Sequence, residues 1–482
     1  MPELQRLYLM QGISTLPVMK RYQAVAVLIS VTFFMENLDA TVIATALPQM
    51  GESFLRSAVD LNVGISAYIL ALAVFIPISG WIADRFGVRR VFASAIGFFT
   101  LASLLCGIAQ TLEQFIAARV LQGIGGAMMV PVGRLVVLRI TEKKDLVRAI
   151  AFITWPGLIA PVLGPPLGGL ITTYTSWRWI FYLNLPLGLI ALVLALRMIP
   201  TGTETRRAPL DWFGFLLVSG ACLTLMFGME QIGQGHDTLG SNLVWILAGL
   251  MLGGLAVWHM RQQEHPLIDL SNLGIKTYRV SLYGGTLFRI SINTAPFLLP
   301  LMFQLCFGFN AFHAGLILLA LFAGNLFMKV FTTPVMRLFG LRRTLIVNGL
   351  VCAVTLLLCA LLSERWPLPA ILLLLFVSGM ARSLQFTANN TLAFADVPKP
   401  RMSDASTLFS TVFQLSTGIG VAIGALALRA SMEWNDHATA QLTDFHTAFI
   451  VIGVIGLLSV IDSLGLARNA GDAVTGHQPR HG

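Results

Sequence analysis

The sequence has few charged residues for its length. Of its 482 residues, only 11% are Asp, Glu, Lys or Arg and 56% are hydrophobic, whereas charged residues make up about 25% of an ordinary soluble domain. A soluble protein of this size could not cover its surface with so few charges. These proportions disfavour a disordered chain or a cytosolic enzyme, and they favour a protein with many membrane-spanning segments.

Cysteine is also scarce, and its positions exclude a disulfide scaffold. The chain has five cysteines, an odd number, and no pair of them has the spacing of a metal site. We interpret them as small packing residues, because all of them fall within apolar runs: Cys106, Cys222, Cys306, Cys352 and Cys359.

The motifs of cofactor-dependent chemistry are missing as well. The sequence has no glycine-rich nucleotide loop, no HExxH and no nucleophile elbow, so ATP-driven transport and hydrolysis have no basis and no cofactor or metal is expected. The net charge of +9 does not indicate a nucleic-acid partner, because the basic residues are scattered over short loops. Membrane lipid is the expected surrounding of the chain, and a monomer is one option for its oligomeric state.

What the chain does have is a series of apolar stretches of about 20 residues, each long enough to cross roughly 30 Å of hydrocarbon. We count fourteen, which predicts an all-α membrane protein with fourteen transmembrane spans. Most of the 32 lysines and arginines, Lys329 among them, fall on the N-terminal side of the membrane. By the positive-inside rule, both termini are predicted to be cytoplasmic.

The first apolar stretch, residues 23–47, could also be a cleavable signal peptide. Lys20 and Arg21 precede it, and Ala44-Thr45-Ala46 resembles a cleavage site. The apolar region of a signal peptide is short and uncharged. This stretch is longer and contains two acidic residues, so we favour a membrane span.

Two distant loops have similar sequences. Residues 80–90 read GWIADRFGVRR, and residues 333–343 read TPVMRLFGLRR. Short basic loops can resemble each other by chance, but each copy follows the second span of a six-span block. Two six-helix bundles that meet around a central cavity are the usual architecture of secondary transporters. The predicted segments are a cytoplasmic N-terminal segment (1–22), an N-terminal six-helix bundle (23–199), a linker with two additional transmembrane helices (200–278), a C-terminal six-helix bundle (279–467) and a cytoplasmic tail (468–482).

The first of these loops resembles the signature of the major facilitator superfamily. The matching positions are Gly80, Ala83, Asp84, Arg85, Gly87, Arg89 and Arg90. The resemblance implies the major facilitator fold and a conformational role for this loop, in which Asp84 locks the two bundles together on the cytoplasmic side. The N-terminus of the thirteenth span, at Ser403-Asp404, offers a partial positive charge to such a carboxylate. The basic loop residues could instead serve topology alone.

Further motifs are similar to those of fourteen-span drug:proton antiporters of the EmrB/QacA type, and RVLQGIGGAMMVPVGRL at residues 119–135 resembles their MdtD-type branch. Leu38-Asp39-x-Thr41 through Ala46-Leu47-Pro48 resembles the first-span motif, although Ala44 and Glu36 replace the Asn and the polar residue that are frequent there. Trp177-Arg178-Trp179 with Asn184-x-Pro186 resembles the sixth span. The fifth-span antiporter motif is matched by a cluster of small and helix-bending residues: Gly157, Pro161, Gly164, Pro165, Gly168 and Gly169.

This fifth-span cluster predicts a smooth, bendable helix that another helix can approach closely. We expect the facing surface to be the glycine-rich part of the fourth span, Gly123 to Ala127. The resemblance implies that this contact seals the interface against proton leakage. Ordinary close packing of helices would leave the same pattern.

Glu36 and Asp39 are the main candidates for proton coupling. They are three residues apart, so they share a helix face, and both lie deep in the first span, where an ionised side chain costs several kcal/mol unless it is paired or neutralised. A low dielectric and a neighbouring like charge both favour the protonated carboxyl. We therefore expect one or both to hold a proton near neutral pH, although a permanently paired structural carboxylate is the alternative.

Arg119 is the expected partner of Asp39. Asp39 lies roughly 12 Å from the outer end of the first span, and Arg119 roughly 9 Å from the outer end of the fourth, so the depths agree. Such a pair would act as a proton-sensitive switch, or else as a static buried ion pair. Arg134, Arg289 and Arg382 also fall within or near spans, and we assign them no role beyond the option that Arg289 lines a cavity.

The cavity lining is predicted from large, adaptable apolar side chains, which suit loosely specified ligands. They could equally face lipid. The candidates are Phe34, Met128, Phe297 and Met302.

The sequence therefore predicts a multi-pass inner-membrane exporter that exchanges a hydrophobic compound for protons by alternating access. A cationic cargo is the first expectation, because Glu36 and Asp39 would attract one. A proton-coupled importer or exporter of a specific metabolite is the alternative on the same fold. An enzyme or receptor is disfavoured, because the loops are too short to form a soluble domain.

Overall fold

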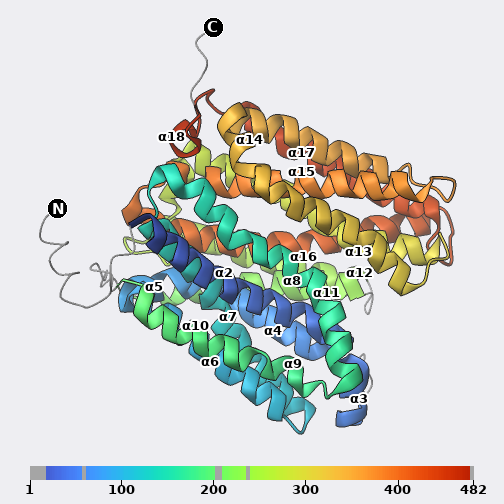
Figure 1. Ribbon diagram of the computed structural model, residues 1–482, viewed down its shortest axis with the longest axis horizontal. Helices are drawn as coiled ribbons and strands as arrows, with labels where there is room; N and C mark the ends of the chain where they lie inside the picture. Colours follow the sequence, from blue (N-terminus) through green and yellow to red (C-terminus); the bar gives the residue numbers. More distant parts are fainter. Residues whose placement is uncertain (1–17, 57–60, 201–208, 235–238, 478–482) are drawn as a thin grey trace, which may run out of the picture.

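The computed structural model describes residues 18–56, 61–200, 209–234 and 239–477, and these ranges are mostly helical and contain no β-strand (Figure 1). Twelve helices in the described ranges are long and apolar enough to cross a membrane. The all-α architecture is thus as predicted, whereas the count differs from fourteen: α8 is not among the twelve, and the very long α14 counts once.

The N-terminal part of the chain forms a group of packed helices that we call the N-terminal bundle. In it, α2 packs against α8, and α7 packs against both α4 and α6. Its elements are α2 (Val18–Val42), α3 (Leu47–Phe54), α4 (Asn62–Phe75), α5 (Ser79–Phe86), α6 (Val88–Ile108), α7 (Leu112–Ile140), α8 (Leu146–Tyr174), α9 (Arg178–Tyr182) and α10 (Asn184–Met198).

A second group, the C-terminal bundle, lies beside the first (Figure 1). Within it, α14 packs against α15 and α17, and α13 packs against α16 and α17. Its elements are α13 (Lys276–Leu305), α14 (Ala311–Cys359), α15 (Leu368–Ala395), α16 (Met402–Trp434) and α17 (Leu442–Leu464), followed by the short α18 (Asp472–Thr475).

Two further helices, α11 (Trp212–Gln234) and α12 (Leu239–Gln262), separate the bundles in sequence. α11 contacts α4 of the N-terminal bundle and α16 of the C-terminal bundle, and α12 packs against α11. Large apolar side chains such as Leu250, Met251 and Trp258 are exposed on α12. An apolar surface of this kind is expected where a helix faces lipid rather than water.

The bundles touch each other through two sets of contacts. α8 packs against α14 and α15, and α16 packs against α5 and α7. Ser403 Oγ donates a hydrogen bond to the carbonyl of Gly80 (3.1 Å), and Ser406 Oγ donates one to the carbonyl of Pro131 (3.1 Å). These bonds join the first turns of α16, which lie near the loop motif, to the N-terminal bundle.

Candidate functional site

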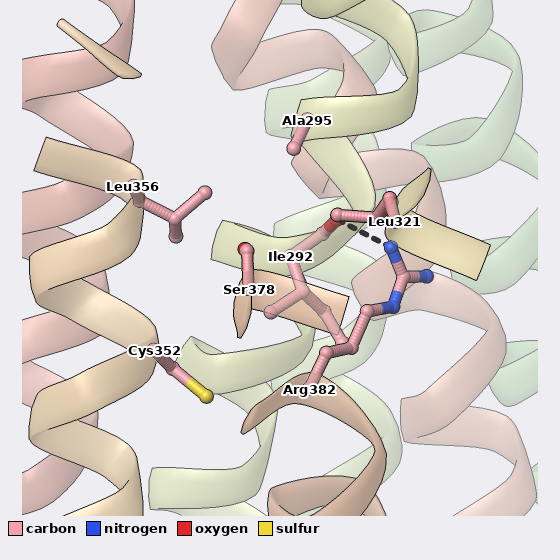
Figure 2. A pocket seen from close by; sticks show the side chains of 7 residues that line it. All are labelled: Ile292, Ala295, Leu321, Cys352, Leu356, Ser378 and Arg382. Carbon is pink, nitrogen blue, oxygen red and sulfur yellow. Dashed lines mark hydrogen bonds between the residues drawn. The ribbon is translucent and has the colours of Figure 1, made fainter. Parts of the chain in front are cut away.

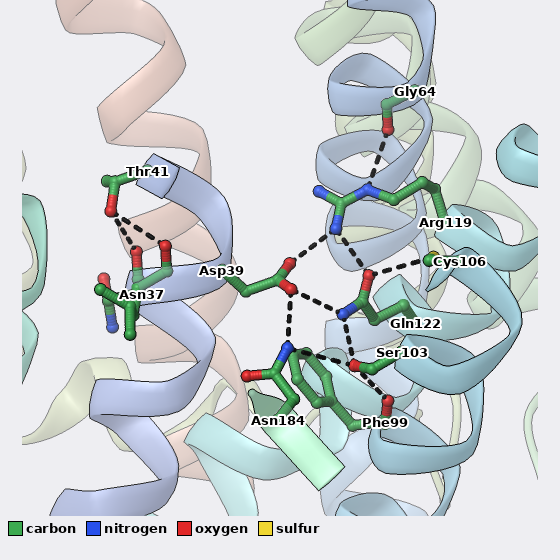
Figure 3. Close-up of polar contacts among 11 residues, drawn as sticks. Asn37, Asp39, Thr41, Gly64, Phe99, Ser103, Cys106, Arg119, Gln122 and Asn184 are labelled. Carbon is green, nitrogen blue, oxygen red and sulfur yellow. Dashed lines mark hydrogen bonds and ion pairs between the residues drawn. The ribbon is translucent and has the colours of Figure 1, made fainter. Parts of the chain in front are cut away.

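Asp39 and Arg119 form a buried ion pair between α2 and α7 (Figure 3). Arg119 Nη1 lies 2.6 Å from Asp39 Oδ2, and both side chains are 0% exposed. The contact predicted from the matching depths of these two residues is therefore confirmed. A buried charge that has an opposite partner avoids most of the cost of leaving water.

Three neutral side chains complete the surroundings of Asp39 (Figure 3). The amides of Gln122 and Asn184 donate to Asp39 Oδ1 at 3.0 and 2.9 Å. Both amides also donate to Ser103 Oγ, at 2.8 and 3.2 Å. The carboxylate is thus bound by donors on α7 and α10, and Ser103 of α6 accepts hydrogen bonds from the two amide donors. A change in the charge of Asp39 therefore alters contacts among four helices, α2, α6, α7 and α10.

Arg119 is fixed on its other side by α4. Its Nε donates to the carbonyl of Gly64 (3.2 Å), and its guanidinium lies 4.3 Å from the ring centroid of Tyr68. A side chain on Gly64 would collide with Phe115 of α7, so a glycine at this position is needed for α4 to lie so close to α7. Arg119 Nη2 is buried and has no hydrogen-bond partner among the described residues.

Glu36 lies one helical turn before Asp39 and is 8% exposed. Its Oε2 and the hydroxyl of Tyr68 are both buried without a hydrogen-bond partner in the described ranges. A methyl group on Gly126 would lie 3.2 Å from the Tyr68 hydroxyl and 3.6 Å from Glu36 Cδ, so all three residues face one spot. Unsatisfied buried polar atoms are rare and mark positions where a function is to be sought.

The sequence-based prediction missed Ser103, Gln122 and Asn184. Gln122 follows Arg119 by three residues and so shares its face, and Asn184 belongs to the sixth-span motif, so both had a usable signal. Ser103 had none, because a serine inside an apolar helix often bonds its own backbone; Ser103 indeed donates to the carbonyl of Phe99.

The loop motif is divided between two tasks. Asp84 pairs with Arg139 of α7 (2.7 Å), within the N-terminal bundle, and not with the N-terminus of α16 as the resemblance implied. The contact with α16 is made by Gly80, whose missing side chain leaves room for Thr407. Arg85 and Arg90 are exposed.

Gly87 and Arg89 have structural counterparts in the second loop. Gly87 has φ 88° and Gly340 has φ 73°, a region that favours glycine. Arg89 donates to the carbonyl of Leu196 at the end of α10, and Arg342 donates to the carbonyl of Leu464 at the end of α17. The two loops therefore share a turn and a helix-capping arginine, as expected of a repeat.

Gly164 and Gly168 of α8 face the C-terminal end of α2 and the residues that follow it, not α7. A side chain on Gly164 would collide with Thr41, and one on Gly168 would collide with Thr45. The prediction that Gly123 to Ala127 form the facing surface is wrong, because Gly123 lies against Tyr68 and Ala71 of α4 and Gly125 lies against Phe99 of α6.

The remaining residues of the span-five motif are less informative. A side chain on Gly169 would meet no described atom within 4 Å. Gly157, Pro161 and Pro165 lie in α8 outside the residues whose side chains are described.

The predicted cavity residues do not converge on one surface. Phe34 and Phe297 are half-buried against different clusters, whereas Met128 (7% exposed) and Met302 (0%) are core residues. The cavity drawn in Figure 2, enclosed by α13, α14 and α15, measures about 10 Å³, room for about one water molecule. Arg382 borders it and donates to the carbonyl of Ile292 (3.2 Å).

Lys329 is placed differently from the prediction. It lies within α14 rather than in a cytoplasmic loop, and its Nζ donates to Thr154 Oγ1 on α8 (3.0 Å) and to Thr387 Oγ1 on α15 (2.8 Å). Lys329 therefore links the two bundles. Hydropathy alone could not separate a lysine inside an apolar helix from one in a neighbouring loop.

Comparison with known proteins agrees with this architecture. A model of the Major Facilitator Superfamily matches residues 29–421, and a second match covers residues 281–473. The chain is 39% identical over 453 residues to the "Putative multidrug resistance protein MdtD" of Serratia proteamaculans, covering 92% of both chains. It is 40% identical over 427 residues to the protein of the same name from Klebsiella pneumoniae, covering 87% of this chain and 88% of that one.

Two solved structures share the fold at low sequence identity. The human organic anion transporter MFSD10 aligns with TM-score 0.61 and 15% identity, over 93% of this chain and 100% of that chain. The proton:xylose symporter XylE aligns with TM-score 0.65 and 13% identity, over 92% and 95%. The chain is a multi-pass membrane transporter that belongs to the major facilitator superfamily.

Proposed function

We propose that this protein exports hydrophobic, drug-like compounds across the bacterial inner membrane in exchange for protons. The observation that carries the proposal is the buried pair of Asp39 and Arg119, since ionisable groups inside a membrane are costly and usually serve transport. The names of the relatives, multidrug resistance proteins from bacteria, support the class of cargo.

We propose fourteen spans for the transporter, with both termini cytoplasmic. α14 has 49 residues and a non-helical glycine, Gly340, inside it; its length of about 74 Å is more than two crossings of a hydrocarbon core of about 30 Å. α8, with 29 residues, is also long enough to cross. Counting α8 and dividing α14 at Gly340 gives the even number that the distribution of basic residues favours.

The coupling step is a change in the charge of Asp39. Protonation removes the counter-ion of Arg119 and weakens the hydrogen bonds from Gln122 and Asn184, which are strongest to an ionised acceptor. The contacts of α2 with α7 and α10 then change together. Glu36 is the second proton acceptor, and it can also attract a cationic group on the cargo.

Opening toward the cytoplasm requires the contacts between the bundles to break. These include Ser403 with Gly80 and Lys329 with Thr154. The close packing of α8 on α2 holds the N-terminal bundle together during this movement. Each proton that crosses the membrane supplies about 2.3 kcal/mol per 100 mV, enough for a modest concentration gradient.

The test uses everted membrane vesicles and a toxin selected by a growth screen. With an acidic lumen, wild-type vesicles should accumulate the toxin at least about tenfold more than Asp39→Asn vesicles. Glu364→Gln is the matched control, because Glu364 is an exposed acidic residue between α14 and α15, and it should behave like wild type. Unchanged accumulation by Asp39→Asn would remove Asp39 from the mechanism.

The direction of flux separates this proposal from proton-coupled import of a metabolite, and the range of compounds moved separates it from proton-coupled export of a specific metabolite. Antiport moves the cargo against the proton flux, so an acidic lumen drives accumulation. Accumulation that requires an alkaline lumen would instead indicate symport and uptake. A screen in which only one metabolite is moved would exclude a multidrug exporter.

A further inference from the structure

Two buried arginines from opposite bundles stack on the same aromatic ring. Arg134 Cζ of α7 lies 5.0 Å from the ring centroid of Phe409, and Arg289 Cζ of α13 lies 4.9 Å from it. Arg134 is 8% exposed and Arg289 is 1% exposed. Two positive charges are thus held close together in the membrane interior, at the contact between the bundles.

Neither arginine has an acidic partner in the described part of the chain. Arg134 Nη1 donates to Ser410 Oγ (3.1 Å), and Arg289 Nη2 makes a long contact of 3.4 Å with Thr286 Oγ1. Arg289 Nε is buried without any partner among the residues that the structure describes. By contrast, the equally buried Arg119 has the carboxylate of Asp39.

Stacking on an aromatic ring offsets only part of the cost of burying a guanidinium. Two such groups side by side also repel each other. An anion between them would remove both penalties, because a guanidinium binds carboxylate and phosphate oxygens with paired, charge-assisted hydrogen bonds. The Nε of Arg289 is a donor that such an anion could use.

The apolar surroundings suit an aromatic molecule. Arg289 Cζ also lies 5.5 Å from the ring of Phe413, and the rings of Phe386 and Phe394 lie 5.9 and 5.3 Å from those of Phe413 and Phe409, respectively. Aromatic rings stack on one another and on guanidinium groups. The region therefore combines two guanidinium groups that can bind an acidic group with a cluster of neighbouring phenylalanine rings.

We propose that Arg134 and Arg289 form a binding site for the anionic group, a carboxylate or phosphate, of an aromatic amphiphilic cargo. The inference rests on the proposed transport function and narrows its cargo. The hydrogen bond from Arg134 to Ser410 crosses between the bundles, so cytoplasmic opening parts the two arginines and admits the anion. Glu36 remains available to a cationic group, and zwitterionic cargo can use both.

Binding of a matched pair of probes to the purified full-length protein tests the site. 1-Naphthylacetate carries a carboxylate, and 1-naphthylacetamide has the same ring with a neutral amide. Isothermal titration should give a dissociation constant on the order of tenfold lower for the acid than for the amide. Arg289→Gln and Arg134→Gln should each reduce this preference to about twofold or less and leave the affinity for the amide nearly unchanged.

Arg382→Gln is the matched control. Arg382 is an arginine of the C-terminal bundle that is bonded to the carbonyl of Ile292, and this variant should keep the preference for the acid. Arg289→Lys, which retains the charge, should keep part of it and serves if the glutamine variants fail to fold. Equal binding of acid and amide by wild type, or an equal loss of preference in Arg382→Gln, would overturn the proposal.

Two further arms separate the anion site from proton coupling and from binding of a lipid headgroup. Asp39→Asn should lose proton-driven flux and keep the preference for the acid, so failure of proton coupling and failure of the anion site can be told apart. Phosphatidylglycerol is added against phosphatidylcholine as a control; displacement of 1-naphthylacetate by phosphatidylglycerol alone would assign the site to a lipid headgroup and overturn its role in cargo binding.

Discussion

In the N-terminal bundle the buried Arg119 has a carboxylate partner, whereas in the C-terminal bundle Arg289 and Arg382 hydrogen-bond only to neutral acceptors among the described residues. The frameworks are nevertheless alike: each bundle turns at a glycine with positive φ and caps a helix with an arginine from that turn. The repeat has thus kept the geometry of its loops while the charges inside the membrane have diverged. The carboxylate on which the proposed proton coupling depends lies in the N-terminal bundle, whereas the proposed anion site takes one arginine from each bundle, Arg134 and Arg289.

The largest effect is expected from breaking the charge balance of the N-terminal bundle. Arg119→Met leaves Asp39 buried without its counter-ion, which should lower the free energy of unfolding by about 3–5 kcal/mol. The double variant Asp39→Asn/Arg119→Met should recover most of this loss. Thermal unfolding in detergent measures both, and a double variant no more stable than Arg119→Met would contradict the pairing argument.

A smaller effect should distinguish the close helix contacts of the two bundles. A Cβ atom on Gly379 of α15 would lie only 1.8 Å from the backbone carbonyl oxygen of Leu321, whereas one on Gly168 of α8 would first meet the side chain of Thr45 and would lie 2.9 Å from the nearest backbone oxygen, that of Val42. A side chain can rotate away and a packed backbone cannot. Gly379→Ala should therefore cost about 1–3 kcal/mol, and Gly168→Ala less, as measured by thermal unfolding.

Gly169→Ala is the control for this pair, because an added methyl group would meet no described atom within 4 Å. It should change the stability by less than about 0.5 kcal/mol. An equal loss in all three alanine variants would show that helix packing does not decide the outcome.

The smallest effect is expected at the helix-capping arginine that the two bundles share. Arg89→Gln and Arg342→Gln each remove a cation from the C-terminal end of a helix, so both should lower stability by about 0.3–1 kcal/mol. Melting temperatures of the two variants should shift by similar amounts. A clear difference between them would argue against structural equivalence of the loops.

The helices and the partner of Asp39 could be predicted from the sequence, because hydropathy gives spans and residue counting gives depth. The rotation of each helix about its axis could not. For this reason Ser103 was missed, and Gly164 and Gly168 of α8 were expected to face α7, whereas they face the end of α2.

Arg134 and Arg289 illustrate the same limit. Their place within or near spans was evident from the sequence, but their meeting at Phe409 depends on how α7, α13 and α16 pack together. Depth is a property of one helix, whereas a site between bundles is a property of several.

The position of α11 has a consequence for any rocking motion of the bundles. A helix that contacts both of them cannot stay fixed to both while they rotate. Toward α4, α11 is held by the hydrogen bonds from Ser219 Oγ to the carbonyl of Val74 (2.7 Å) and from Ser66 to Glu230. Toward α16, its Met226 and Met229 lie next to Gly418, and methionine side chains re-pack readily. We therefore expect the contact between α11 and α16, at Met226 and Met229, to be the one that slides. α11 and the adjoining α12 should then move together with the N-terminal bundle, which contains Asp39.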